Sequence, residues 1–117
     1  MIHHVSLELD RHDVDAEVTF WALLGFAETT PPGALAERAR WVQRDGVQIH
    51  LVYAQSPSIP RGGHVAVVLT DYDTVLDRLR ASRHDAAPRA EHFGSPRTQV
   101  RSPAGHLVEL MAPPPGG

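Results

Sequence analysis

Hydrophobic and polar residues alternate over the first ten positions, a pattern typical of a half-buried β-strand. In the stretch HVSLEL every second residue is apolar and the residues between are polar. The polar face begins with His4 and continues with Ser6 and Glu8. The pattern therefore predicts a strand from Ile2 to Leu9 that carries a histidine on the face opposite its apolar residues.

A helix and three further strands are expected next. Apolar residues at helical spacing predict a helix over residues 14–24, with Asp13 as its N-cap and Gly25 at its end. The dipeptide Asp45-Gly46 separates two apolar runs and is a strong hairpin signal. The strands expected in this part are residues 26–30, 38–44 and 47–54.

The stretch RGGHVAVVLTD begins the same order of elements again. We expect a strand from His64 to Thr70 and then a helix that is capped by Asp71 or Asp73 and runs to about Ala81. The turn Ser102-Pro103-Ala104-Gly105 precedes the last strand. Residues 85–93 are irregular or an edge strand, and the last two expected strands are residues 97–101 and 106–111.

The two halves align on each other at two separate points. His4-Val5 matches His64-Val65 at an offset of 60 residues, and His50 matches Glu109 at an offset of 59. Two anchors at opposite ends of a module agree within one residue, which indicates an internal repeat. Each half is predicted to be one βαβββ module.

A single α+β domain over residues 1–117 is the expected organisation. Its fold would be paired βαβββ modules that form a cupped mixed sheet, with the helices on the outer face. The parts within this domain are module one (about 1–54), a linker (55–63), module two (about 64–112) and a Pro/Gly tail (113–117).

Composition narrows the classes of partner. A formal net charge of −3 argues against nucleic acid, because phosphate binding needs a basic surface. The chain has no cysteine, so its metal ligands cannot be thiolates. No apolar run is long enough to span a membrane, and we expect a cytoplasmic protein. A chain of 117 residues often gains stability from a second copy, so a homodimer is expected.

The matched positions of the repeat carry the residues best suited to bind a metal. His4, His50 and His64 each lie on a predicted strand, on the face opposite the large apolar residues, and so does Glu109. If the halves pair about a pseudo-two-fold axis, these four side chains converge. Three imidazoles and one carboxylate suit a divalent ion, which could be Zn, Fe, Ni, Co or Mn.

The segments HHVSLELD, FWALLGF, VQIHLVYA, GGHVAVVLTD and SPAGHLVELMAP together resemble the vicinal-oxygen-chelate superfamily. That group includes glyoxalase I, bleomycin-resistance proteins, fosfomycin-resistance enzymes and extradiol dioxygenases. The resemblance covers His4 to Met111 and implies paired βαβββ modules, association of two subunits and metal ligands at His4, His50, His64 and Glu109.

The resemblance implies a glyoxalase-like metalloenzyme that acts on a small substrate with two neighbouring oxygens. His50 and Glu109 would be its catalytic residues, moving a proton in a lyase or isomerase reaction. Glyoxalase I has an acidic residue where this chain has His50, which puts lactoylglutathione lyase activity in doubt. Two alternatives stay open: an Fe(II) extradiol-type dioxygenase, and a metal-free resistance protein that binds a drug.

Overall fold

The computed structural model describes residues 1–115 and divides into two compact units, Met1–Ile59 and Pro60–Gly117. The boundary between the units lies inside the predicted linker 55–63. Gly116 and Gly117, the end of the predicted tail, lie outside the described residues. That one domain unites the two units stays a prediction.

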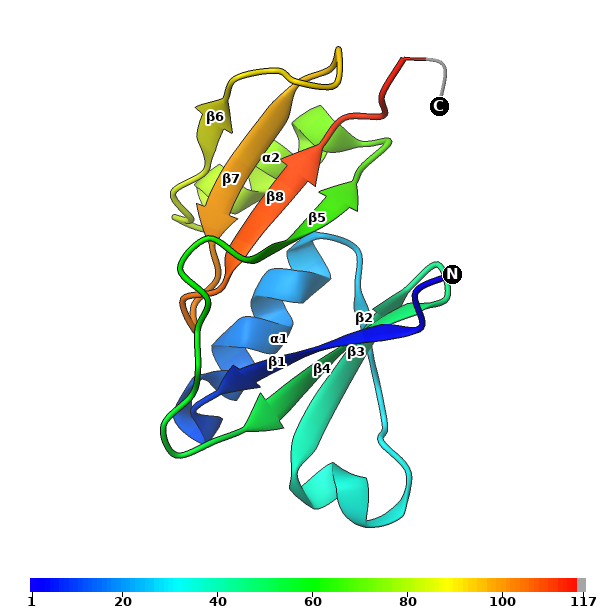
Figure 1. Ribbon diagram of the computed structural model, residues 1–117, viewed down its shortest axis with the longest axis vertical. Helices are drawn as coiled ribbons and strands as arrows, with labels where there is room; N and C mark the ends of the chain where they lie inside the picture. Colours follow the sequence, from blue (N-terminus) through cyan, green and yellow to red (C-terminus); the bar gives the residue numbers. More distant parts are fainter. Residues whose placement is uncertain (116–117) are drawn as a thin grey trace. The chain divides into compact units, whose positions relative to one another are not determined.

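The first unit has the predicted order of elements (Figure 1). Its four-stranded sheet has the order β1-β4-β3-β2, with β1 parallel to β4 and the other neighbours antiparallel. The elements are β1 (His4–Leu9), the 3-10 turn η1 (Arg11–Asp13), α1 (Val14–Leu23), β2 (Ala27–Thr29), η2 (Gly33–Glu37), β3 (Ala39–Arg44) and β4 (Val47–Tyr53).

The second unit repeats this topology. Its sheet has the order β5-β8-β7-β6, again with one parallel pair, β5 and β8. The elements are β5 (His64–Val68), α2 (Tyr72–Ala81), β6 (Ala87–Arg89), β7 (Arg97–Arg101) and β8 (Leu107–Met111). The predicted α+β class with two βαβββ modules is confirmed.

The repeat extends to register and burial. His4 pairs with Gln48 in the first unit, and His64 pairs with Leu107 in the second, so the offset of 59 to 60 residues is kept in both strands of each parallel pair. The alternation of exposed and half-buried residues along residues 1–10 recurs unchanged along residues 61–70. Both units therefore present corresponding strand positions on corresponding faces.

Each helix covers the apolar face of its own sheet, as Figure 1 shows. In the first unit Trp21 of α1 is fully buried, and its ring meets Phe26 edge to face at 5.1 Å. In the second unit the hydroxyl of Tyr72 on α2 is hydrogen-bonded to Thr98 of β7. Covering one face by a helix leaves the other face of each sheet for polar side chains.

Helix α1 begins where it was predicted to begin, at Val14 directly after Asp13. Asp13 precedes the helix, but its side chain makes no capping hydrogen bond and its backbone is already helical. Asp10 instead accepts a hydrogen bond from the backbone N–H of His12, 2.8 Å away, and so begins the 3-10 turn that continues into α1. The cap position of α1 was therefore predicted correctly, but the side chain of Asp13 does not make the capping hydrogen bond.

The hairpin between β3 and β4 has the predicted two-residue turn. Asp45 and Gly46 both have positive φ angles, 49° and 80°. Positive φ at both central residues defines a type I′ turn, which matches the twist of the two strands. The turn fixes the register of the hairpin and places Trp41 opposite His50.

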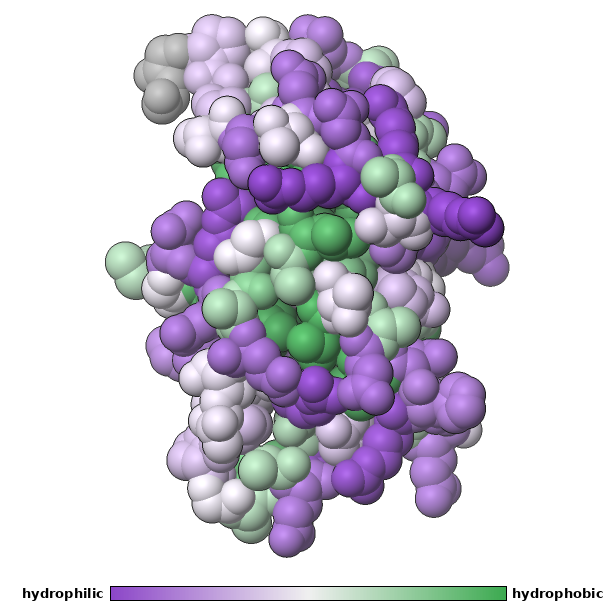
Figure 2. Space-filling view, turned by 180° about the vertical axis from the view of Figure 1, so that it is seen from behind, coloured by the Kyte–Doolittle hydropathy of each residue, from purple (hydrophilic) through white to green (hydrophobic). Residues whose placement is uncertain are grey.

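The surface combines hydrophilic and hydrophobic residues. On the face seen in Figure 2, hydrophobic residues are exposed as well as hydrophilic ones. Within residues 1–115, no helix has the length and apolar character needed to cross a membrane.

Candidate functional site

In the first unit the strand register brings His4 and His50 together. His4 of β1 lies opposite Gln48 of β4, and His50 is two positions further along the same face. The two imidazole rings are stacked, with centroids 4.1 Å apart and planes 12° from parallel. The structure thus brings these two candidate ligands together within the first unit.

Two further contacts hold the ring of His50. The indole of Trp41 stacks on the other side of the imidazole, with ring centroids 3.9 Å apart and planes 5° from parallel. Nε2 of His50 is 2.8 Å from Oε1 of Gln48. Since an amide oxygen only accepts, Nε2–H donates and the lone pair is on Nδ1. His50 is therefore fixed between two aromatic rings with one nitrogen able to bind a cation.

Burial, followed by the neighbouring charges of His4 and His3, lowers the pKa of His50 below its ordinary value. His50 is 8% exposed, whereas His3 and His4 are exposed and share a hydrogen bond of 2.9 Å between their Nδ1 atoms. A lowered pKa keeps the imidazole of His50 neutral at pH 7, which is the form that binds metals and accepts protons.

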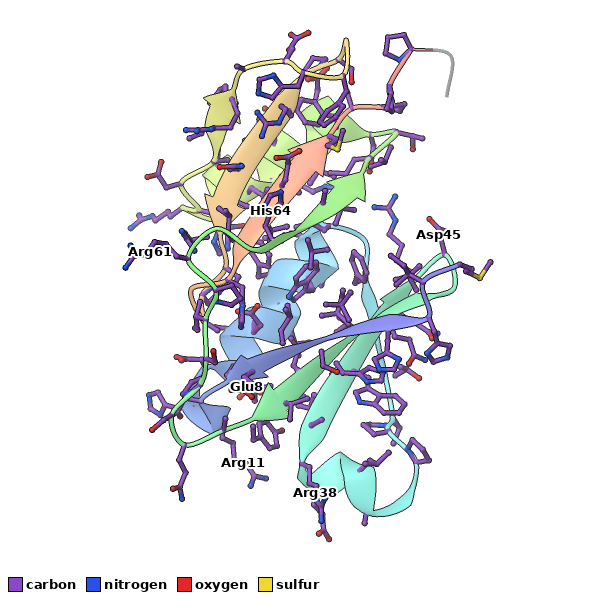
Figure 3. All side chains as sticks on the ribbon, in the orientation of Figure 1. Glu8, Arg11, Arg38, Asp45, Arg61 and His64 are labelled. Atoms are coloured by element: carbon purple, nitrogen blue, oxygen red, sulfur yellow. The ribbon has the colours of Figure 1, made fainter. Side chains whose placement is uncertain are left out.

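In the second unit the same register brings His64 and Glu109 together. His64 begins β5 (Figure 3), and Glu109 of β8 lies opposite the small residue Ala66. Nε2 of His64 is 3.8 Å from Oε1 of Glu109. Nδ1 of His64 donates to the carbonyl oxygen of Gly62 at 2.8 Å, so the lone pair is on Nε2, the nitrogen nearer the carboxylate. The structure thus brings these two candidate ligands together within the second unit.

Glu109 is buried, and two residues of β7 hold it as a carboxylate. Arg97 Nη2 donates to Oε1 at 2.7 Å, and Gln99 Nε2 donates to the same oxygen at 3.3 Å. The hydrogen bond from Arg97 lowers the pKa of Glu109 most; the Gln99 hydrogen bond and the charges of Arg97 and His64 lower it further, against the opposing effect of burial. Glu109 is therefore ionised at neutral pH.

The imidazole and carboxylate donors suit a divalent ion. The spacing of His64 and Glu109 also suits one, whereas the parallel rings of His4 and His50 do not. The separation of 3.8 Å between His64 and Glu109 leaves room for an ion bound to both at ~2.0–2.2 Å. Imidazole lone pairs lie in the ring plane, so the parallel rings of His4 and His50 cannot both reach one ion until one of them turns. No cluster of three or more metal-ligating side chains able to hold an ion occurs within residues 1–115.

Glu8 and Tyr53 both make contacts within the first unit that stabilise its structure. Glu8 Oε1 accepts the backbone N–H of Ser58 at 2.9 Å, which attaches residues 55–59 to β1. Tyr53 lies under the guanidinium of Arg11, 4.8 Å from its ring centroid. Both contacts lie at the end of the first sheet to which the carboxyl ends of β1 and β4 point.

The sequence interpretation missed Trp41, Arg97 and Gln99. A signal for them was present, because a two-residue turn at Asp45-Gly46 sets Trp41 opposite His50. The hairpin of β7 and β8 likewise sets Gln99 opposite Glu109. Residues opposite a predicted ligand on the neighbouring strand are the natural positions for groups that orient it.

Comparisons with solved structures show the fold. The chain is similar to a glyoxalase family protein from Bacillus anthracis (TM-score 0.85, 20% identity, covering 96% of this chain and 93% of that one). It is similar to a glyoxalase/dioxygenase from Nostoc punctiforme (TM-score 0.78, 18% identity, covering 97% of this chain and 91% of that one). It is also similar to a lactoylglutathione lyase from Agrobacterium tumefaciens (TM-score 0.72, 20% identity, covering 96% of this chain and 92% of that one).

No protein-family model matches the sequence, and no curated protein matches it in sequence. The likeness to the solved structures is therefore one of fold, spanning nearly the whole chain at low identity. The chain has the fold of the vicinal-oxygen-chelate superfamily, in which glyoxalases, dioxygenases and the fosfomycin-resistance protein FosX are found. The fold that the sequence resemblance implied is confirmed.

Proposed function

We propose that the chain is a glyoxalase-like metalloenzyme. It binds one divalent ion through His4, His50, His64 and Glu109 and acts on a small substrate with two neighbouring oxygens, in a lyase or isomerase reaction. The observation that carries the proposal is the equivalent placement of a polar pair on the parallel strands of each unit, His4 with His50 and His64 with Glu109.

The contacts of the second pair support this proposal. Metal-binding histidines commonly donate their other ring N–H to a carbonyl or carboxylate, as His64 does to Gly62. Glu109 is held in place beside His64 by the hydrogen bonds that Arg97 and Gln99 donate to its Oε1. In the first pair, His50 is fixed by Trp41 and Gln48, and the exposed His4 is the ring expected to turn.

The proposal requires both pairs to reach one ion, either within one chain or between two copies in a homodimer. A divalent ion held there would act as a Lewis acid on two neighbouring oxygens of the substrate. His50, kept neutral by its lowered pKa, is suited to take a proton from the substrate carbon beside the carbonyl. If its bond to the ion were weak, the ionised Glu109 would be the alternative group to take this proton, and the group that takes it would return it to the substrate. We expect the enzyme to act in the cytoplasm.

Metal content tests the proposal. The protein should be purified without chelators and its bound metals measured by elemental analysis, for the wild type, His64→Ala and the control His12→Ala. His12 is exposed and its backbone, not its ring, is hydrogen-bonded to Asp10. We expect metal in the wild type and in the control, and little in His64→Ala. A metal-free wild type would instead favour the drug-binding alternative.

An Fe(II) dioxygenase is the second candidate function. His64, Glu109 and one histidine of the first unit form the two-histidine, one-carboxylate set of non-haem iron oxygenases, and one structure of similar fold is named a glyoxalase/dioxygenase. Oxygen uptake on catechols that depends on iron would favour this reaction. Activity without oxygen on a ketone or aldehyde substrate would favour the lyase or isomerase.

A further inference from the structure

Three arginines share one face of the second sheet. Arg97 and Arg101 of β7 lie on the same face as Gln99, because side chains alternate along a strand. Arg89 of β6 pairs directly with Arg97 in the antiparallel register and so lies on that face as well. Glu109 also lies there, opposite Gln99. Three positive charges therefore share this face with one carboxylate.

The corresponding positions of the first unit carry no such charge. Ala39, Trp41 and Gln43 of β3 correspond to Arg97, Gln99 and Arg101 of β7, since Trp41 pairs with His50 as Gln99 pairs with Glu109. The positive charge is therefore a property of the second unit alone. Like charges directly opposite each other destabilise a sheet, so the pair of Arg89 and Arg97 has a cost that a bound anion would remove.

The contacts of Arg97 leave part of its hydrogen-bonding capacity unused. Its side chain is 12% exposed; Nη1 donates to the carbonyl of Ala90 at 2.8 Å, and Nη2 donates to Glu109. Its Nε atom is buried without a hydrogen-bond partner. Nη1 and Nη2 each carry a second N–H, and these two groups can donate hydrogen bonds to an anionic oxygen. Arg101, by contrast, donates to the carbonyls of Gly105 and Arg61.

We propose that the substrate is an anion whose carboxylate group is bound by Arg97, with Arg89 attracting it from the edge strand. This inference rests on the proposed function and names the substrate class of that site. The negative group lies beside the pair of oxygens that the ion would chelate, because Arg97 touches the ligand Glu109. The planar fork of Arg97 favours such a group, since it can donate two parallel hydrogen bonds.

The test compares two chelators that both offer neighbouring oxygens. Oxalate carries two negative charges and acetohydroxamate carries fewer. Both are titrated calorimetrically into the full chain, with and without Co2+, for the wild type, Arg97→Met, Arg97→Lys and Arg89→Gln. Arg80→Gln is the control, because Arg80 is exposed on α2 and loses the same charge away from the face in question.

We expect Arg97→Met to weaken oxalate binding about 10- to 100-fold, the usual worth of a hydrogen bond to a charged group. Acetohydroxamate binding should change by less than about threefold, because its contacts are with the ion and not with the arginine. Arg97→Lys should give an intermediate loss for oxalate, and the exposed Arg89→Gln a loss of about two- to fivefold that disappears at high salt.

Equal losses for the two chelators, or none for oxalate in Arg97→Met, would overturn the inference. If Arg97→Met does not fold, Arg97→Lys and Arg89→Gln decide in the same way. A wild type that takes up no Co2+ refutes the proposed function alone. In that case oxalate binding to the metal-free chain still tests Arg97: a loss in the variant supports the anion site, and an unchanged or absent signal overturns it.

Discussion

Replacing Trp41 by leucine should weaken metal binding, although the indole is not proposed to touch the ion. The indole lies flat on His50, 3.9 Å away and 5° from parallel, and Gln48 holds the other edge of the imidazole. Without Trp41 the ring of His50 keeps its hydrogen bond to Gln48, but the only stack left is the one with His4, and we expect His4 to turn when an ion binds. Trp41 is thus a positioning residue for the proposed ligand His50.

The size of the effect follows from the stacking contact. An aromatic pair contributes ~0.5–1.5 kcal/mol beyond the area that it buries. If that free energy orients His50, its loss weakens metal binding about 2- to 10-fold. Trp41→Phe keeps a flat ring on His50 and should stay within about twofold of the wild type.

The assay is a competition for Zn2+ between the protein and a chromophoric chelator at pH 7.5. Far-ultraviolet circular dichroism shows that each variant is folded. We expect the order of affinities to be wild type, then Trp41→Phe, then Trp41→Leu. Wild-type affinity in a folded Trp41→Leu variant would refute the role given to the stack.

Three further predictions concern pH and stability. The pKa of folded His50 is lowered from 6.5, so the unfolded chain takes up the proton at a higher pH than the folded chain does. The free energy of unfolding, measured by urea titration, should therefore fall as pH drops below about 6.5. This fall should be smaller in His50→Gln. The pKa of folded Glu109 is lowered from 4.5, so its contribution to the free energy of unfolding is complete above about pH 4.5 and is lost as pH falls through the lower pKa of the folded state. Urea titrations of Glu109→Gln should not show this loss. Leu51→Ala should cost ~2–5 kcal/mol in urea unfolding, since Leu51 is fully buried, and a cost below 1 kcal/mol would show that the core around β4 is loosely packed.

The strand and helix pattern could be predicted because each unit has a simple period. Alternation along β1 and β5 placed His4 and His64 on the polar faces, and the repeat offset paired His50 with Glu109. These placements need only strand parity and a count along the chain. The start of α1 at Val14 was predicted as well, but the pattern could not show that Asp10, and not Asp13, makes a capping hydrogen bond.

The contacts around the candidate ligands depend on side-chain conformations, which sequence periodicity does not encode. Stacking of His4 on His50 requires particular rotamers of both rings. The ion pair between Arg97 and Glu109 joins residues that are not directly opposite in the register, since Arg97 pairs with Met111, and it depends on the reach of a long side chain. Strand parity alone could place these residues on one face but could not show which of them touch.

The central claim is that one ion is bound by ligands from both units. The most direct test is a titration of Co2+ into the wild type, into His50→Ala from the first unit and into Glu109→Gln from the second, followed by visible absorption. We predict about one tightly bound ion per chain in the wild type and loss of the same absorption band in both variants. Full binding in either variant, or separate bands lost by the two, would contradict a shared site.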